Sequence, residues 1–392
     1  MYISKMTLTN WKNFKSVEVD LQKRTFIVGP NASGKSNFLD AIRFLRDIVK
    51  QGGSLQEAVS LRGGVSKIRC VASRKNSDIT IGIVISNNHN QAEWEYSLTF
   101  NQKGGGIAEL KAIVKREFLK NLLTGKVWID RYHHQEKDEY LLEFTHIEQA
   151  FINVHFKPFV DFLNEITYLH LIPQLIREPQ SFLKVSQSED YYGRNFFERI
   201  SSLNKNTRNA YLRRIEKALT TILPNLEKLS FEKDEAGTPH LEATFKQWRA
   251  KGMKHTEKYF SDGTLRLIAL FWVLLDGNKP VLLEEPELSL HSAIVQQLAD
   301  IIYVLQKKKN YSERQVILTT HSYELLNNRG IALEEILLVK YEGEEGSSIF
   351  PAVYFKDIKQ YLQFGENVAE LILQRTAPKN PLQIPLSFET NE

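Results

Sequence analysis

Cysteine is almost absent from this sequence. Cys70 is the only one among 392 residues, which excludes an internal disulfide and a zinc site built from several thiolates. A chain of this size with a single thiol fits the reducing cytoplasm. We expect Cys70 to be a buried structural residue.

Long apolar runs are missing as well. No stretch of the sequence approaches the roughly 20 apolar residues that a membrane-spanning helix needs. Residues 1–5 lack the charged segment and apolar core of a secretory signal. We therefore expect a soluble cytoplasmic protein with no membrane partner.

A strong charge of one sign is the third absence. Lysine and arginine total 51 and aspartate and glutamate total 47, which leaves a formal charge of +4. This mild excess permits a DNA partner without arguing for one. Basic residues recur in short segments, for which a solvated surface and a DNA-binding surface both stay open. These segments are residues 111–120, 208–214, 246–254 and 307–309.

A glycine-rich loop follows an apolar, strand-like run near the N-terminus. Residues 29–36 read G-P-N-A-S-G-K-S, which matches the phosphate-binding fingerprint at every defined position. Helical spacing of apolar residues begins directly after it, so the loop has the strand and helix that its mechanism needs. In such a loop Lys35 neutralises the β- and γ-phosphates of ATP, and Ser36 ligates Mg²⁺. The residues expected to contact the nucleotide are Asn31, Ala32, Ser33, Gly34, Lys35, Ser36 and Asn37.

Acidic residues follow a second apolar run, at residues 281–283. In open α/β sheets ligands gather at the carboxyl ends of strands. Glu284 would therefore hold the magnesium ion, and Glu285 would activate the water that attacks the γ-phosphate. Taken alone, glutamates around Pro286 also fit a solvated turn. Together with the phosphate loop they favour a catalytic site.

Two further polar turns stand beside apolar segments. His321 follows the strand-like run 316–318, where it could sense the γ-phosphate; a structural histidine is the alternative. Ser261, Asp262 and Gly263 open an apolar helix, and either Ser261 or Asp262 would cap it. Capping explains these two residues, but it does not explain the order in which all the motifs succeed one another.

Strand-like and helical segments alternate at both ends of the chain. This alternation predicts an α/β protein with a mainly parallel sheet. Residues from about 67 to 114 alternate in the manner of antiparallel strands, whereas helical segments are expected near 157–165, 194–203 and 206–222. We expect an N-terminal nucleotide-binding part with an antiparallel β lobe (1–114), a helical subdomain (115–224) and a C-terminal part (225–392).

The order of the motifs resembles that of ABC-type ATPase heads: phosphate loop, long insertion, serine-glycine signature, acidic strand and histidine loop. Residues 8–15 (LTNWKNFK) and 284–291 (EEPELSLH) resemble the branch containing SMC, RecF and OLD-family proteins. The resemblance covers most of residues 1–45 and 255–325. It implies a P-loop NTPase with ABC-type head architecture.

In that family two heads sandwich two ATP molecules. The resemblance implies a homodimer, or a higher oligomer, in which Ser261 and Gly263 of one subunit meet the γ-phosphate held by the other. It also implies that Lys12 touches the nucleotide and that Gln174 is a metal ligand. Lone heads of this kind resemble the ATPase subunits of anti-phage systems, in which a separate nuclease-like effector acts, and the family binds DNA.

Two positions depart from the family pattern. Glu284 replaces the usual aspartate, and Asp262 replaces the first glycine of the signature. These changes leave open the alternative that the protein is a regulatory scaffold that binds ATP with little turnover. A hexameric motor is disfavoured because its acidic strand would follow the phosphate loop much sooner. The segment after His321 shows no acidic metal cluster on apolar strands, so we expect no Toprim nuclease domain.

Overall fold

The computed structural model describes residues 1–74, 76–103, 111–149, 154–177, 193, 196–246, 253–306, 314–358 and 368–376. The chain divides into two compact units, residues 1–166 with 319–392 and residues 167–318. Within the described part, no helix is both long enough and apolar enough to cross a membrane.

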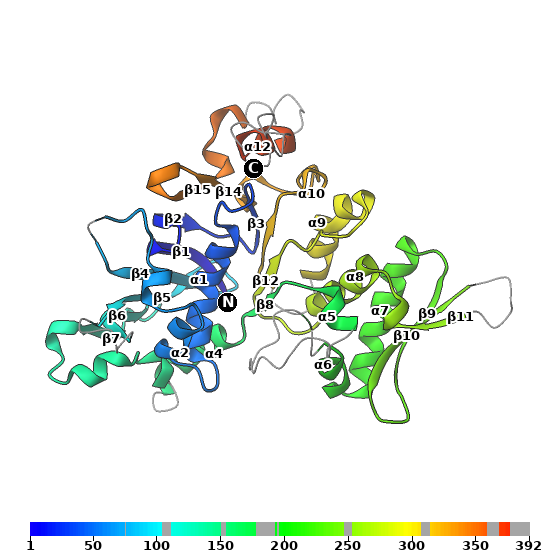
Figure 1. Cartoon of the computed structure of the whole chain (residues 1–392), viewed down its shortest axis with the longest axis horizontal. Coiled ribbons are helices and arrows are strands. Elements are labelled where there is room, and N and C mark those ends of the chain that lie inside the picture. Colours follow the sequence, from blue (N-terminus) through cyan, green and yellow to red (C-terminus); the bar gives the residue numbers. More distant parts are fainter. Residues whose placement is uncertain are drawn as a thin grey trace, which may run out of the picture. The chain divides into compact units, whose positions relative to one another are not determined.

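The first unit is built on a sheet that joins both ends of the chain. The fully buried strand β3 pairs in parallel with β14, as expected for a strand covered on both faces. Strand β15 runs antiparallel to β14 and parallel to β2 (Figure 1). The bounds are β1 Tyr2–Trp11, β2 Phe14–Asp20, β3 Arg24–Val28, β14 Ile336–Tyr341 and β15 Ser347–Pro351.

An antiparallel lobe extends this sheet. The strand order is β7-β6-β5-β4-β1-β2-β15-β14-β3, and every neighbouring pair from β7 to β2 is antiparallel. The predicted β lobe is thus confirmed, although the boundary expected at residue 114 falls inside β6. Charged residues lie on both faces of β6 and β7, including the buried Glu117 and Arg131, and they obscure the apolar alternation there. The bounds are β4 Ile79–Ser86, β5 Ala92–Gln102, β6 Ala112–Asn121 and β7 Val127–Tyr132.

Helix α1 (Lys35–Val49) packs its apolar face into this unit. Phe44 stacks on Phe100 and contacts Trp11 edge-on, with ring centroids 5.2 Å apart in both pairs. Cys70 is buried, as predicted. The other helices of the unit are α2 Leu55–Ser60, α3 Val65–Ile68, α4 Lys157–Asn164, α10 Tyr323–Leu326 and α12 Val368–Thr376, with 3-10 turns at His133–Gln135, Glu139–Glu143, Ile147–Gln149, Val154–Phe156, Leu333–Glu335, Gly343–Glu345 and Ala352–Tyr354.

The second unit combines helices, a parallel strand pair and a small sheet. β8 (Thr167–Leu169) pairs in parallel with β12 (Val281–Glu284), and a three-stranded antiparallel sheet lies beside α7 (Figure 1). The helices expected near 194–203 and 206–222 are confirmed as α6 and α7. The remaining bounds are α5 Pro173–Arg177, α6 Phe196–Ser202, α7 Lys205–Ile222, α8 Asp262–Leu275, α9 Ser292–Gln306, β9 Leu226–Lys233, β10 Pro239–Phe245, β11 Met253–Thr256 and a 3-10 turn at Glu257–Tyr259. Strand β13 (Val316–Thr320) contains the boundary between the units.

A buried carboxyl group in the β lobe makes stability depend on pH. Glu117 is fully buried and accepts hydrogen bonds from the Tyr96 hydroxyl and the His146 amide. Burial raises the pKa of Glu117 to about 7, although hydrogen bonds from the His146 and Ile147 amides and the charge of Arg131 act in the opposite direction. A raised pKa means that the folded state binds the proton more tightly than the unfolded state.

Glu117 therefore stabilises the fold fully below its ordinary pKa of 4.5, and this contribution is lost as pH rises through about 7. We expect the free energy of unfolding to fall by up to about 3 kcal/mol between pH 4.5 and 8 on this account. The fall should be much smaller in Glu117→Gln. Urea unfolding at several pH values measures it, with the half-buried Glu95→Gln as control; equal slopes in all three proteins would contradict the assignment.

Candidate nucleotide-binding site

The phosphate loop, residues 29–36, connects β3 to α1. Gly34 is the N-cap of α1 with φ +112°, and no side chain caps the helix. The amide groups of the first turn therefore keep their capacity to donate to an anion, which the helix dipole also favours. The local order of strand, loop and helix is the one predicted from the sequence.

Two glycines of this loop leave no room for a side chain. A Cβ atom on Gly29 would lie 2.7 Å from both Ser33 Oγ and the Val339 carbonyl oxygen. On Gly34 it would lie 2.1 Å from the Asn13 amide nitrogen, in a backbone conformation that L-residues seldom adopt. The shape of the loop thus depends on glycine at both places.

The polar side chains of the loop point to a phosphate ligand. Lys35 is buried, and its ammonium donates to the carbonyl oxygens of Gly29 (2.8 Å) and Pro30 (3.1 Å). Ser33 Oγ is buried and has no hydrogen-bond partner among the described residues. A buried hydroxyl in that condition costs about 1–3 kcal/mol, which a phosphate oxygen would offset. Ser36 is exposed and offers the hard oxygen that Mg²⁺ prefers.

Asn13 holds the loop in place, and the sequence analysis did not identify it. Its amide donates to the Ser33 carbonyl and to Ser347 Oγ, both at 2.7 Å. Its carbonyl accepts from the Asn37 amide at 2.9 Å, while the Asn37 backbone oxygen accepts from the Trp11 indole. The predicted nucleotide contact Asn37 is therefore also part of the scaffold. The only sequence feature that could have indicated Asn13 is its position in the LTNWKNFK segment, which resembles the SMC, RecF and OLD branch.

Asn13→Ala is expected to weaken ATP binding about tenfold. The variant loses hydrogen bonds that fix the Ser33 carbonyl and Asn37, and each is worth about 1 kcal/mol. Titration with a fluorescent ATP analogue measures the change. The control is Asn101→Ala, whose amide donates to Ser77 and Asp78 in the β lobe. Equal losses in both variants would trace the effect to general destabilisation.

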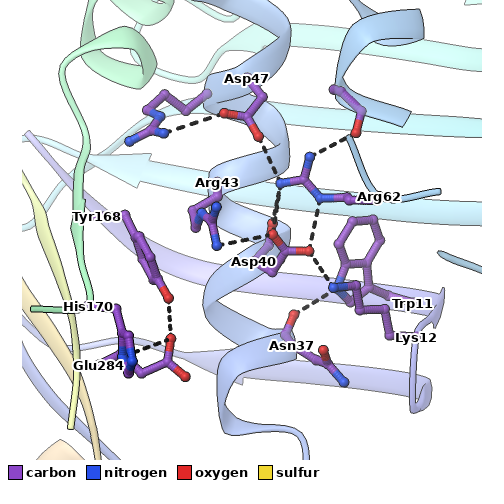
Figure 2. A network of polar contacts seen from close by, with 12 residues as sticks. Trp11, Lys12, Asn37, Asp40, Arg43, Asp47, Arg62, Tyr168, His170 and Glu284 are labelled. Atoms are coloured by element: carbon purple, nitrogen blue, oxygen red, sulfur yellow. Dashed lines mark hydrogen bonds and ion pairs between the residues drawn. The ribbon is translucent and has the colours of Figure 1, made fainter. Parts of the chain in front are cut away.

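Lys12 points to an acidic residue of α1. Its ammonium lies 2.6 Å from Asp40 Oδ2, and Arg62 grips both carboxylate oxygens of Asp40 and reaches Asp47 (Figure 2). Burial alone would raise the pKa of Asp40, but the charges of Arg62 and Lys12 more than offset this and lower it to about 2. A contact between Lys12 and the nucleotide stays a prediction.

The acidic turn, residues 284–287, begins where β12 ends. Glu284 accepts a hydrogen bond from the Tyr168 hydroxyl, and His170 Nδ1 lies 3.9 Å from the same Oε2 atom (Figure 2). Glu285 has φ +43°, an uncommon conformation for a residue with a side chain. Such strain costs about 1–3 kcal/mol and tends to occur at functional sites.

The signature turn, residues 261–263, is fixed from two sides. Ser261 caps α8 by accepting from the Thr264 amide, as predicted. A Cβ on Gly263 would lie 2.7 Å from the Ser289 carbonyl, so glycine permits the close approach of the two segments. The signature turn thus approaches the backbone of the segment that follows the acidic turn.

Gln174 contacts the signature turn. Its amide donates to Asp262 Oδ2 at 2.7 Å, and Arg177 pairs with Oδ1 of the same residue at 2.6 Å. Asp262, which departs from the family's glycine, thus has two partners on α5 that sequence reasoning missed. Ligation of a metal by Gln174 stays a prediction.

His321 directly follows β13 and is exposed. It belongs to the first unit, as do the phosphate loop and Lys12; Glu284, Glu285, the signature turn and Gln174 belong to the second. The part of His321 in sensing the γ-phosphate therefore stays a prediction.

Of the basic segments, residues 249, 251 and 307–309 lie outside the described part of the chain.

Comparison with known proteins gives short sequence matches. The chain is 35% identical over 72 residues to the DNA replication and repair protein RecF of Acaryochloris marina. It is 52% identical over 44 residues to the chromosome partition protein Smc of Methanocaldococcus jannaschii, and 45% over 47 residues to the endonuclease GajA of Bacillus cereus. These matches span 15%, 11% and 12% of this chain, and 19%, 4% and 8% of the relatives.

The fold is similar over a much larger part of the chain. A structure of the SmcHead bound to the C-winged helix domain of ScpA matches 89% of this chain and 97% of that one, with a TM-score of 0.55 and 19% identity. The α/β fold of an ABC-type ATPase head is thus confirmed, together with the resemblance to the SMC, RecF and OLD branch. Residues 24–327 match the family described as "AAA domain, putative AbiEii toxin, Type IV TA system". The chain belongs to this family of AAA domains.

Proposed function

We propose that the chain binds ATP with Mg²⁺ at the phosphate loop and hydrolyses it to ADP and phosphate. The observation that carries the proposal is the loop itself. It combines a helix without a side-chain cap, a buried lysine and the Ser33 hydroxyl, which has no partner within the described part of the chain. Ser36 and Glu284 would hold the magnesium ion, which offsets phosphate charge when bound.

Glu285 would accept a proton from the attacking water. A carboxylate directly after the proposed metal ligand suits this role, and the strained backbone of Glu285 supports a functional position. His321 would hydrogen-bond the γ-phosphate. Lys12 and Gln174 would complete the contacts to the nucleotide and the metal.

ATP would also hold two copies of the chain together. In this arrangement Ser261 and Gly263 of one subunit meet the γ-phosphate bound by the other, so binding closes the dimer and hydrolysis opens it. The support is the polar, exposed Ser261 at the start of α8 and its family resemblance. The cycle would gate action on DNA or on a separate nuclease-like effector, in DNA repair or anti-phage defence. The printed names of the relatives, a DNA replication and repair protein, a chromosome partition protein and an endonuclease, support action on DNA.

The test is the mass of the protein in solution with and without ATP and Mg²⁺. Glu285→Gln should trap an ATP-dependent dimer, and adding Ser261→Arg should abolish it because the long cation blocks the signature turn. Ser202→Arg, at an exposed serine of α6, is the matched control. An oligomeric state that ignores both ATP and Ser261→Arg would refute the sandwiched dimer and leave a nucleotide-binding protein.

A scaffold with little turnover is the second candidate. It is favoured by Glu284 in place of aspartate and by Asp262, whose carboxylate is already paired with Arg177 and Gln174. In this case ATP holds the dimer and an effector, but phosphate release is negligible. Steady hydrolysis that disappears in Glu285→Gln would reject the scaffold.

A further inference from the structure

The acidic strand carries a longer side chain than its family pattern prescribes. Glu284 has one methylene more than the usual aspartate, and therefore one more torsion that must be fixed before its carboxylate can hold an ion. A metal site works when its ligands are held by neighbouring groups in the right orientation. The question is which residues hold Glu284.

Strand β8 and the residue that directly follows it supply two candidates on the same face of the sheet. β8 and β12 pair in parallel, with Tyr168 opposite Leu282 and Leu169 opposite Leu283. Side chains alternate along a strand, so Tyr168 and His170 point to the face to which Glu284 points. The register itself thus brings a phenol and an imidazole to the carboxylate.

The contacts agree with the register. The Tyr168 hydroxyl donates to Glu284 Oε2, and His170 Nδ1 lies 3.9 Å from that oxygen (Figure 2). Tyr168 is 8% exposed and the Glu284 side chain 14%, so both are sheltered from competing water. Both neighbours lie at Oε2, which orients the carboxylate.

We propose that Tyr168 and His170 are positioning residues that fix the Glu284 carboxylate for the magnesium ion. Their contacts restrict the additional torsion of Glu284. An aspartate at this position would not need these contacts. Tyr168 contributes most, because its hydroxyl donates directly, whereas His170 confines the carboxylate from a longer distance. The inference rests on the proposed role of Glu284 as a metal ligand.

The test measures how much Mg²⁺ is needed for binding of a fluorescent ATP analogue. Tyr168→Phe should raise the half-maximal Mg²⁺ concentration about 10- to 100-fold. Affinity for the analogue without metal should not change. Electron paramagnetic resonance of bound Mn²⁺ measures the affinity of the site for a metal ion directly, without any turnover. His170→Asn should change it less than Tyr168→Phe does.

Tyr96→Phe is the matched control, because that buried tyrosine donates to the Glu117 carboxylate in the β lobe. It should leave the Mg²⁺ requirement unchanged. A double-mutant cycle adds a sharper condition: in Glu284→Asp the shorter carboxylate no longer depends on Tyr168, so adding Tyr168→Phe should have no further effect. Thermal melting of each variant checks that it is folded.

The results distinguish the positioning role of Tyr168 from the proposed metal-binding role of Glu284. If Glu284→Gln leaves the Mg²⁺ requirement unchanged, the proposed metal site itself is wrong. If Glu284→Gln raises the requirement while a folded Tyr168→Phe behaves like Tyr96→Phe, the metal site stands and the positioning role is refuted. Equal effects of Tyr168→Phe in the Glu284 and Glu284→Asp backgrounds would also overturn the compensation.

Discussion

Glu285→Gln is expected to bind ATP normally and to hydrolyse it at least about a hundredfold more slowly than the unchanged protein. Removal of a general base costs about 10²- to 10⁴-fold in rate. Glutamine has nearly the same shape as glutamate, so it can keep the positive φ of this position while it loses the basic oxygen. Binding and catalysis should therefore separate in this variant.

Two measurements on Glu285→Gln show this separation. Titration with a fluorescent ATP analogue gives the affinity, and phosphate release in a single turnover gives the chemical step. Glu242→Gln is the control, since Glu242 pairs with exposed Lys254 on the small sheet. Hydrolysis in Glu285→Gln at the rate of the Glu242→Gln control would place the base elsewhere.

Arg62→Leu is expected to have the largest effect on stability. The guanidinium contacts Asp40 at 2.8 Å and Asp47 at 2.9 Å, and the side chains of these carboxylates are only 10% and 1% exposed. It also lies over the Phe44 ring. Removing one partner of a buried ion pair costs about 3–5 kcal/mol because a charge is left poorly compensated. Lys12 and Arg43 near Asp40 keep the loss toward the lower value.

Chemical unfolding with Arg62→Leu and Arg62→Lys gives the test. Lysine restores a charge but not the fork that reaches two carboxylates, so it should recover only part of the stability. Arg74→Ala is the matched control: its pair with Glu344 is 76% and 85% exposed, and its loss should stay below about 1 kcal/mol. If Arg62→Leu also lost less than about 1 kcal/mol of unfolding free energy, the ion pairs of Arg62 with Asp40 and Asp47 would contribute little to stability.

The pH profile gives a second check on this cluster. Because the pKa of Asp40 is lowered to about 2, its contribution to stability is present above its ordinary pKa of 3.8 and is lost as pH falls through about 2. Arg62→Leu should therefore be most destabilised at neutral pH, and the difference from the unchanged protein should shrink in acid.

Local patterns predicted much of this protein. The strand, loop and helix around Lys35, the cap at Ser261 and the α/β class could all be inferred, because each depends on residues close together in the sequence. Asn13, Arg62 and Tyr168 could not. Asn13 binds Ser347, 334 positions away, and Tyr168 binds Glu284, 116 positions away. No spacing rule connects such partners, since they meet only through the pairing of strands.

The same long separations affect how the chain is made. β3, which leads into the phosphate loop, pairs with β14, and Asn13 needs Ser347 to complete its contacts. During synthesis from the N-terminus, β3 is made more than 300 residues before β14 and Ser347, so it lacks these partners until they have been translated. Until then its apolar edge is open, and open edges favour aggregation. Products truncated before β14 are therefore expected to be insoluble, and the proposed nucleotide site would form only after β14 has been synthesised.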